Sequence, residues 1–471
     1  MKRLLAPAVL TLFAACAVGP DYHRPEIETE AKFAAAETEA YAAQAEPVVE
    51  WWRSLDDPLL AEWIETAVTR NHDIRIAETS LRAARAVLGS HKLERYPIAT
   101  TQASVTRQED SAAVALSPDP GQRFYSVELD ATWELDFFGR VRRSVQAATA
   151  EANAAQEALR DTFVIVSAEL ARTYFEVKGA QYRLAVAERN AENQRQTFEL
   201  TQALLQGGRG TDLDIARARA QLETTLAGIP PLESDVNAGM HRLAVLLGEP
   251  PAALGGELAS ADLPALPAVL DIGDPAGLLR RRADVRQAEY ALQAQTARVG
   301  VAVADLFPRV SLLGSVGYLA TSASDLGDRD ARQTRFGPFL SWPAFDLGRV
   351  RANVKVANAS MDAALLRYEQ TVLTALEETE NGLFGFTRAR TRQARLEVAA
   401  QASQEAADLA RLRYRDGADS FLTVLDAESR LLQAQDQLAQ SSTDTALAFV
   451  LLYKALGGGW EAVDADLLAT H

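Results

Sequence analysis

The side chains that could perform nucleophilic or metal chemistry are few in this sequence. The 471 residues include one cysteine, Cys16, and five histidines that are scattered along the chain. One cysteine cannot form a disulfide within a chain, and a cysteine zinc site needs several thiolates. Neither a Gly-x-Ser-x-Gly elbow nor a Walker-type phosphate loop occurs in the sequence. We therefore expect no enzyme activity, no metal site and no bound cofactor.

The thiol of Cys16 stands where it could carry a covalent lipid. A short basic segment at 1–3 precedes an apolar run at 4–15, and small residues lead into the cysteine. This layout is typical of a cleaved secretory signal. It also resembles the signal of bacterial lipoproteins, in which the new N-terminal cysteine forms a thioether to diacylglycerol. We expect a signal peptide at 1–15 and a lipid anchor, with acyl chains such as palmitate, on Cys16. The alternative is an ordinary signal peptide with an incidental cysteine.

The charge of the chain argues against a nucleic-acid-binding protein, and its hydrophobic pattern argues against a protein with membrane-spanning helices. The net charge is −16 and no run of basic residues occurs, whereas nucleic-acid binding needs clustered lysine and arginine. Although 48% of the residues are hydrophobic, no apolar stretch after the signal approaches the roughly 20 residues of a spanning helix. Any further membrane contact must therefore be made by another kind of structure.

The sequence repeats itself with an offset near 210 residues. Matches at an offset of 209 and at an offset of 211 differ by a two-residue slip, which places the length difference in the loops. The matched residues include Trp133 with Trp342, Gly139 with Gly348, Gly208 with Gly417, Asp73 with Asp284, and Pro97 with Pro308. Such a duplication must be recognised before the fold is considered. We predict repeats at 56–250 and 275–457, a connector at 251–274, an N-terminal lipid-anchored segment at 16–55 and a tail at 458–471.

Each repeat predicts the same order of elements. A helix, at 72–94 or 283–305, ends before a proline that disfavours helical backbone in the preceding residue. A β-hairpin follows at 98–137 and again at 309–343. Residues 125–137 alternate strictly between apolar and polar side chains, as expected for a strand with one apolar and one polar face.

The remainder of each repeat predicts one long helix and one shorter returning helix. Residues 140–206 and 349–416 contain no proline and are rich in strong helix formers. Helices of this length would be about 100 Å long. Returning helices are predicted at 211–248 and 420–457. Glycines are expected at the turns, with Gly139 and Gly348 between strand and helix, and Gly208 and Gly417 between the helices of each pair.

The predicted strands are suited to a membrane only if several chains combine. Their length is close to the roughly 9–11 residues that a tilted membrane strand needs. A sheet in lipid must close, and the smallest membrane barrels have about eight strands, more than this chain supplies. Closure therefore needs two, three or four chains. Trp133 and Trp342 are candidate membrane-interface aromatics at strand ends, with ordinary packing as the alternative.

Short motifs occur along almost the whole mature chain, at 16–22 with Pro25, Trp51-Trp52, Asp57-Pro58-Leu59, 71–74, 281–286, Phe307-Pro308, Tyr414, Gly417, Leu422 and Leu425-Asp426-Ala427. Together they resemble outer-membrane efflux lipoproteins, the OprM-like and NodT-like members of the TolC family. The resemblance implies a mainly α protein with membrane β structure, in which a trimeric 12-stranded outer-membrane β-barrel continues into a long periplasmic α-helical barrel. Ala283 departs from the family, which usually has proline there.

The resemblance implies a function and partners. It implies a passive duct that exports small molecules across the periplasm and the outer membrane of a Gram-negative bacterium. The implied partners are two further copies of the chain, a periplasmic adaptor and an inner-membrane pump of the proton-driven RND type. The duct of a type I protein secretion system is one alternative, and a periplasmic coiled-coil scaffold without a pore is another. The cargo is left open among drugs, detergents, metal ions and metabolites.

The resemblance also implies a periplasmic gate at the turns between long and returning helices. Asp214 and Asp426 match acidic gate positions, and Tyr414 matches a tyrosine that tethers neighbouring helices. Thr423 replaces another gate acid, and Asp419 lies where some relatives have a basic tether. We therefore expect a gate with different polar contacts here.

A purely local role for the same side chains is also open. Thr211-x-x-Asp214 predicts a capping box, and Ser420 could be a helix N-cap. An acid in the first turn of a helix is also favoured by the helix dipole.

Overall fold

The structure, a computed structural model, describes residues 17–36, 41–42, 48–109, 121–255, 258 and 263–461. The predicted signal peptide, Cys16 and most of the predicted tail lie outside these residues. The chain divides into two compact units. The first unit contains the described residues of 1–26, 80–156 and 287–370, and the second contains the remaining described residues. Each unit therefore combines segments of both repeats.

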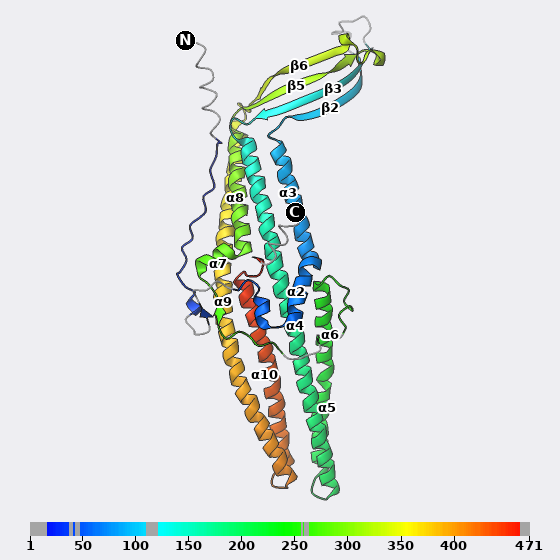
Figure 1. The fold of residues 1–471 in the computed structure, drawn as a ribbon, viewed down its shortest axis with the longest axis vertical. Coiled ribbons are helices and arrows are strands. Elements are labelled where there is room, and N and C mark those ends of the chain that lie inside the picture. Colours follow the sequence, from blue (N-terminus) through cyan, green and yellow to red (C-terminus); the bar gives the residue numbers. More distant parts are fainter. Residues whose placement is uncertain are drawn as a thin grey trace. The chain divides into compact units, whose positions relative to one another are not determined.

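The first unit contains an antiparallel sheet of four strands (Figure 1). The strand order is β2-β3-β5-β6, so the hairpin of each repeat stays intact and the two hairpins join through β3 and β5. Two short 3-10 turns, η3 (Ala323–Asp325) and η4 (Arg329–Ala331), connect β5 to β6. The strands are β2 (Ile98–Glu109), β3 (Gly121–Leu135), β5 (Arg309–Ala320) and β6 (Arg332–Ser341).

The register gives the sheet one polar and one apolar face. Residues directly opposite one another in antiparallel strands share a face. Leu129 lies opposite Val316, which continues the apolar face across β3 and β5. Glu128 lies opposite Gln102 on β2 and belongs to the polar face. Among the described strands, β2 and β6 each pair with one neighbour only, so both edges of this sheet carry unpaired backbone groups.

Two long helices pass from one unit into the other. They are α4 (Arg140–Gln206) and α9 (Leu347–Arg415), with 67 and 69 residues. The prediction placed them at 140–206 and 349–416. Two shorter helices, α3 (His72–Leu93) and α8 (Ala283–Ala304), also contain a unit boundary. The continuity follows from sequence, because proline is absent and strong helix formers dominate in both long segments.

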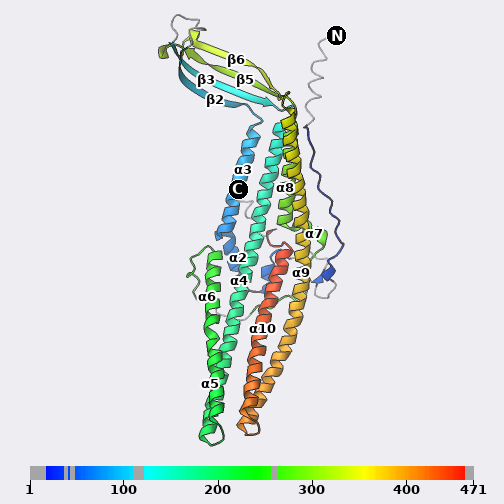
Figure 2. The same ribbon diagram turned by 180° about the vertical axis from the view of Figure 1, so that it is seen from behind.

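The second unit contains the returning helices and the remaining short elements. Both views show α5 beside the C-terminal part of α4, and α10 beside the C-terminal part of α9 (Figures 1 and 2). Its complete helices are α2 (Pro58–Arg70), α5 (Asp212–Ala227), α6 (Ile229–Leu246), α7 (Pro275–Arg281) and α10 (Phe421–Ala455). Its short elements are η1 (Ala34–Ala36), β1 (Tyr41–Ala42), η2 (Trp51–Leu55) and β4 (Leu270–Asp271).

The prediction of one returning helix at 211–248 was wrong. The structure has two helices there, α5 and α6, separated at Gly228. Pro230 and Pro231 explain the break, because a proline inside a helix lacks the amide donor and clashes with the preceding turn. In the first turn of a new helix neither cost applies. The second repeat has no proline at this place, and α10 is continuous over 35 residues.

The Trp51-Trp52 pair forms part of the core of the second unit. The Trp51 ring stacks on Tyr453 with centroids 5.6 Å apart and meets Phe449 edge-on at 5.9 Å. Trp51 and Trp52 are 1% and 2% exposed. Nearby, β1 pairs in parallel with β4, which ties the N-terminal segment to the connector. The Trp51-Trp52 motif therefore serves to pack the core of this unit.

Within the described residues, no helix combines the length and the apolar character needed to cross a bilayer.

Candidate functional site

The turns that end α4 and α9 have the same backbone construction. Gly208 and Gly417 adopt φ of 75° and 77°, a region that glycine reaches without a steric penalty. The following amide donates to a carbonyl five residues earlier, from Arg209 to Leu204 and from Ala418 to Arg413, at 2.8 Å in both turns. Each long helix thus ends in a compact turn, and of the candidate gate residues Asp419 lies in the second turn itself, while the other three lie on the helices beside the turns.

Asp214 caps the start of α5. Its carboxylate accepts hydrogen bonds from the backbone amide of Thr211 at 3.2 Å and from the Thr211 hydroxyl at 2.7 Å. The Asp214 amide donates to the Thr211 hydroxyl oxygen at 3.2 Å. The capping box predicted from Thr211-x-x-Asp214 is confirmed, so any gate role of Asp214 is additional to this local one.

The acids at the other turn also have local partners. Asp426 pairs with Arg430 at 3.0 Å, and both side chains are exposed. Asp419 accepts hydrogen bonds from the Thr423 hydroxyl at 2.9 Å and the Ser420 amide at 3.0 Å. These hydrogen bonds lower the pKa of Asp419, and the charge of Arg413 adds to the effect.

The prediction of Ser420 as an N-cap is correct only in position. Ser420 occupies the N-cap of α10, but its side chain makes no capping hydrogen bond to the helix. Asp419, one residue earlier, accepts from the Ser420 amide and the Thr423 hydroxyl. An aspartate provides a charged acceptor at the positive end of the helix, which favours it over the serine hydroxyl.

Tyr414 of α9 is buried where the helix pair α4 and α5 meets the helix pair α9 and α10. It is 7% exposed, and its ring centroid lies 5.5 Å from that of Phe421. Burial raises the pKa of Tyr414, and the charge of Asp214 raises it further. The Thr201 side chain lowers it in part. The hydroxyl makes no hydrogen bond of normal geometry within the described residues. The surrounding cluster contains Ala218, Ala410, Phe421 and Val424.

A series of polar contacts between α4 and α10 was not predicted from the sequence. The donors on α4 recur every seven residues, so they lie along one side of the helix. One acceptor on α10, Glu428, is 4% exposed and accepts a second hydrogen bond, from Arg411 of α9, at 2.7 Å. The three α4 to α10 contacts are Arg183 with Asp436, Asn190 with Gln435, and Thr197 with Glu428, each at 2.7 Å.

Arg209 brings the two turns into contact. Its guanidinium group lies directly against Gly417, at the position that a Cβ atom would occupy. No neighbour lies within 4 Å of the corresponding position at Gly208. The two turns share their backbone geometry, but only the second receives a side chain from the other.

The other predicted site residues lie at the end of the sheet in the first unit. The indole of Trp133 donates to the Arg95 carbonyl at 2.9 Å, and that of Trp342 donates to the Leu306 carbonyl at 3.0 Å. Gly139 has φ of 81° between β3 and α4. The corresponding turn prediction for Gly348 was wrong, because α9 begins at Leu347 and includes it. Asp346, the residue before this helix, accepts a hydrogen bond from the Arg349 side chain at 2.6 Å.

A protein-family model described as outer membrane efflux protein matches the chain twice, over residues 63–249 and 275–458. The chain belongs to the outer membrane efflux protein family. The two matches cover both halves of the sequence duplication, on either side of the connector.

The chain is similar to a nodulation protein and to outer-membrane channel proteins. The chain is 30% identical to nodulation protein T of Rhizobium leguminosarum bv. trifolii over 466 residues, 98% of each chain. It is 32% identical to outer membrane protein OprJ of Pseudomonas aeruginosa over 454 residues, 96% of this chain and 94% of OprJ. The solved structure of the outer-membrane channel OprN is 42% identical, with a TM-score of 0.90 and coverage of 95% and 100% of the two chains.

These likenesses confirm the predicted family, fold class, efflux function and outer-membrane location. The chain is an efflux channel of the outer membrane that reaches into the periplasm. Its family consists of ducts and is not an enzyme family.

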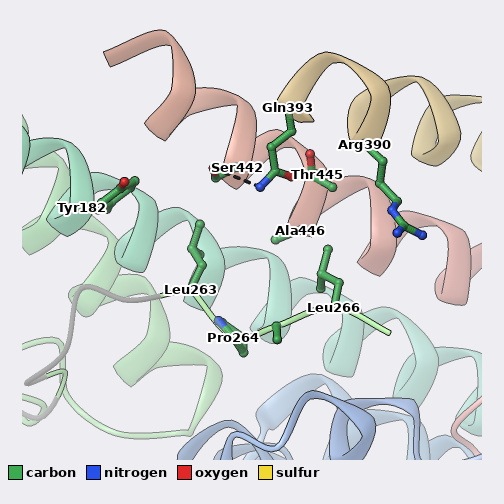
Figure 3. A pocket seen from close by; sticks show the side chains of 10 residues that line it. Tyr182, Leu263, Pro264, Leu266, Arg390, Gln393, Ser442, Thr445 and Ala446 are labelled. Atoms are coloured by element: carbon green, nitrogen blue, oxygen red, sulfur yellow. Dashed lines mark hydrogen bonds between the residues drawn. The ribbon is translucent and has the colours of Figure 1, made fainter. Parts of the chain in front are cut away.

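One pocket in the second unit is lined by the connector and by the helices α4, α9 and α10 (Figure 3). It has a volume of about 430 Å³. The Gln393 amide donates to the Ser442 hydroxyl at 3.3 Å across it, and Arg390 donates to the Ala268 carbonyl at 2.8 Å. Arg390 thus fastens the connector to α9. The lining comprises Leu263 to Leu266 of the connector together with Tyr182, Arg390, Gln393, Ser442, Thr445 and Ala446.

The described part of the chain contains no group of three or more histidine, cysteine, aspartate or glutamate side chains arranged to hold a metal ion. The described residues support polar and electrostatic chemistry. It consists of charges at the helix turns, contacts between helix pairs and a sheet with two unlike faces.

Proposed function

We propose that three copies of the chain assemble into a duct that passively conducts small molecules, with one end gated at the turns between the helix pairs. The observation that requires several copies is the sheet, and the number three is what the family resemblance implies. The sheet has four strands, one apolar face and two edges with one neighbour each among the described strands. In a bilayer such edges must be paired. Three sheets of this kind would close into a barrel of twelve strands with the polar faces inward.

We propose a lipid anchor on Cys16 and two protein partners. The anchor rests on the layout of the sequence before Cys16. The partners would be a periplasmic adaptor and an inner-membrane pump of the RND type. Support comes from the names of similar proteins, which include the outer membrane protein of a toluene efflux pump.

We propose that the gate uses Asp214, Asp426, Tyr414 and Asp419. Three of them carry charges beside the turns, and the fourth is buried where the two helix pairs meet. Three copies around one axis would bring like charges together, which costs energy unless cations or water screen them. A narrow acidic ring would therefore favour cations and restrict the flow of ions.

Single-channel recordings in planar bilayers test the duct and the gate together. We expect Asp214→Asn combined with Asp426→Asn to raise conductance and to reduce cation selectivity. Asparagine is preferable to alanine at 214 because it retains an acceptor for the Thr211 cap. Asp416→Asn is the matched control, since Asp416 is an acid of the same turn outside the proposed gate.

Two results would contradict the proposals. Absence of channels from a purified wild-type trimer would exclude the duct. Unchanged conductance and selectivity in the assembled Asp214→Asn, Asp426→Asn trimer would exclude the acidic gate alone.

A further inference from the structure

The first described residues form an extended arm, 17–24, that is bound tightly within the first unit. The Val18 amide donates to the Phe138 carbonyl at 3.1 Å. Further along, the Tyr22 hydroxyl donates to Glu289 of α8 at 3.2 Å, and Arg24 pairs with the same carboxylate at 3.0 Å. The arm is therefore fixed at both ends although it contains no helix or strand.

Arg143 of α4 holds the centre of this arm. Its side chain is 4% exposed, which is unusual for an arginine. The guanidinium group donates to the carbonyls of Val18 at 3.1 Å and Gly19 at 3.2 Å, and it pairs with Asp21 at 2.8 Å. A buried guanidinium needs such partners, since an unpaired buried charge is costly. The planar fork of arginine reaches all of them at once, which a lysine could not do.

Two glycines allow the arm to come this close. Gly19 lies against the backbone of Gly300 in α8, and neither position has room for a side chain. A methyl group on Gly300 would lie 2.8 Å from the Cγ, Cδ and Nε atoms of Arg143. Gly300 therefore keeps space for both the arm and the arginine. Glycine within a helix is less favourable than alanine, so close packing, and not helix propensity, accounts for a glycine at this position.

The start of the arm lies at the turn between strand and helix. Ala17 packs on Gly139, the glycine that separates β3 from α4. Next to this turn, the rings of Phe138 and Phe307 stack with centroids 4.7 Å apart, and Phe137 is 39% exposed. The residue that follows Cys16 is thus seated beside the apolar end of the membrane sheet.

We infer that Arg143 and the two glycines form a seat that fixes the N-terminus, so that the lipid proposed on Cys16 enters the bilayer next to the base of the sheet. This inference rests on the proposed lipid anchor. A lipid on a short, fixed tether gives the attached sheet a high effective concentration at the membrane, whereas a long free arm gives a lower one. The seat would therefore promote insertion of the lipidated chain and make no difference to a chain without lipid.

Hydrogen exchange on the purified full-length protein tests the seat directly. We expect Arg143→Ala to reduce protection of the Val18 amide by about five- to thirty-fold, because several hydrogen bonds to the arm are lost. Arg143→Lys should restore part of the protection. Gly300→Ala should also reduce it, although alanine improves the helix. Arg298→Ala is the control, since Arg298 pairs with Glu151 in the same unit. Unchanged protection in Arg143→Ala would overturn the seat.

A double-mutant comparison tests the link to the lipid. The amount of trimer in the outer membrane is measured with and without Arg143→Ala, in the natural chain and in a chain exported with a non-lipoprotein leader and starting at Ala17. We expect about a fivefold loss of trimer in the lipidated chain and little change in the other. An equal loss in both backgrounds would mean that Arg143 only stabilises the fold, and it would overturn the inference.

Mass spectrometry of the mature wild-type chain completes the test. A mass without acyl chains would overturn the inference, and channel recordings on the same sample would still show whether the duct itself is correct.

Discussion

Thr197 of α4 donates a hydrogen bond to Glu428 of α10 at 2.7 Å, and this glutamate is 4% exposed. Arg411 of α9 donates to the same carboxylate oxygen at 2.7 Å. One buried acid therefore joins three helices from both repeats. Its position near the turns makes it a central contact between the helix pairs of the efflux channel.

Glu428→Gln should weaken the association of these helices. The amide keeps an acceptor for Thr197 but loses the charge opposite Arg411, and we expect about 1–3 kcal/mol less stability. Thermal unfolding followed by circular dichroism measures the change. Asp436→Asn is the control, because the Arg183–Asp436 pair is partly exposed and such pairs contribute below about 1 kcal/mol. Equal effects of both variants would mean that Glu428 carries no special weight.

Asp161 of α4 should make stability depend on pH. It lies in a pocket of about 170 Å³ with Arg282, Asp284, Glu378 and Lys454. Burial raises the pKa of Asp161 to about 6, and the nearby acids add to the shift while the two cations oppose it. The folded chain therefore binds more protons than the unfolded chain between pH about 4 and 6, so stability falls as pH rises through this window.

Asp161→Asn should remove this dependence and raise stability near neutral pH by about 1–3 kcal/mol. Unfolding midpoints measured from acidic to neutral pH compare the two proteins. A variant that keeps the wild-type pH profile would show that Asp161 is not responsible.

The indole hydrogen bonds at the base of the sheet should contribute equally in both repeats. Trp133 and Trp342 donate to Arg95 and Leu306 at nearly equal distances. Replacing either with phenylalanine keeps a ring and removes the donor, so each variant should lose about 0.5–1.5 kcal/mol. Thermal stability of the detergent-solubilised protein provides the measurement. A loss confined to one variant would show that the two bonds are not equivalent.

The repeated order of elements, the long helices and the helix caps could be predicted, because they follow from the sequence duplication and from patterns of a few residues. The donors Trp133 and Trp342 differ by 209 residues and the acceptors Arg95 and Leu306 by 211, the two offsets of the sequence duplication. The α4 helix follows from the absence of proline, and the Thr211 cap from a four-residue pattern. Such features need no knowledge of distant neighbours.

The contacts between helices could not be predicted in the same way. Arg183, Asn190 and Thr197 are spaced by seven residues, but polar side chains at that spacing are equally consistent with a solvated face. Their partners on α10 lie 231 to 253 residues away in sequence, and only packing reveals the pairing. The Arg143 seat was missed for a similar reason, since a single arginine in an arginine-rich segment gives no sign of burial.

Gly208 and Gly417 provide a matched test of the contact between the turns. Both have positive φ, so alanine at either position should cost about 1–2 kcal/mol of backbone strain. Only at Gly417 would the new methyl group displace Arg209, and the flexible arginine can move away at little further cost. We therefore expect similar losses of stability from Gly208→Ala and Gly417→Ala, measured by thermal unfolding.

The two variants should differ in channel conductance. If the contact of Arg209 with Gly417 helps to keep the turns together, Gly417→Ala should raise single-channel conductance in planar bilayers and Gly208→Ala should not. Arg209→Ala should reproduce the higher conductance without the strain, because it removes the same contact and leaves the glycine conformation intact. A wild-type conductance in Arg209→Ala, or an equal increase in Gly208→Ala, would show that backbone strain and not this contact controls the turns.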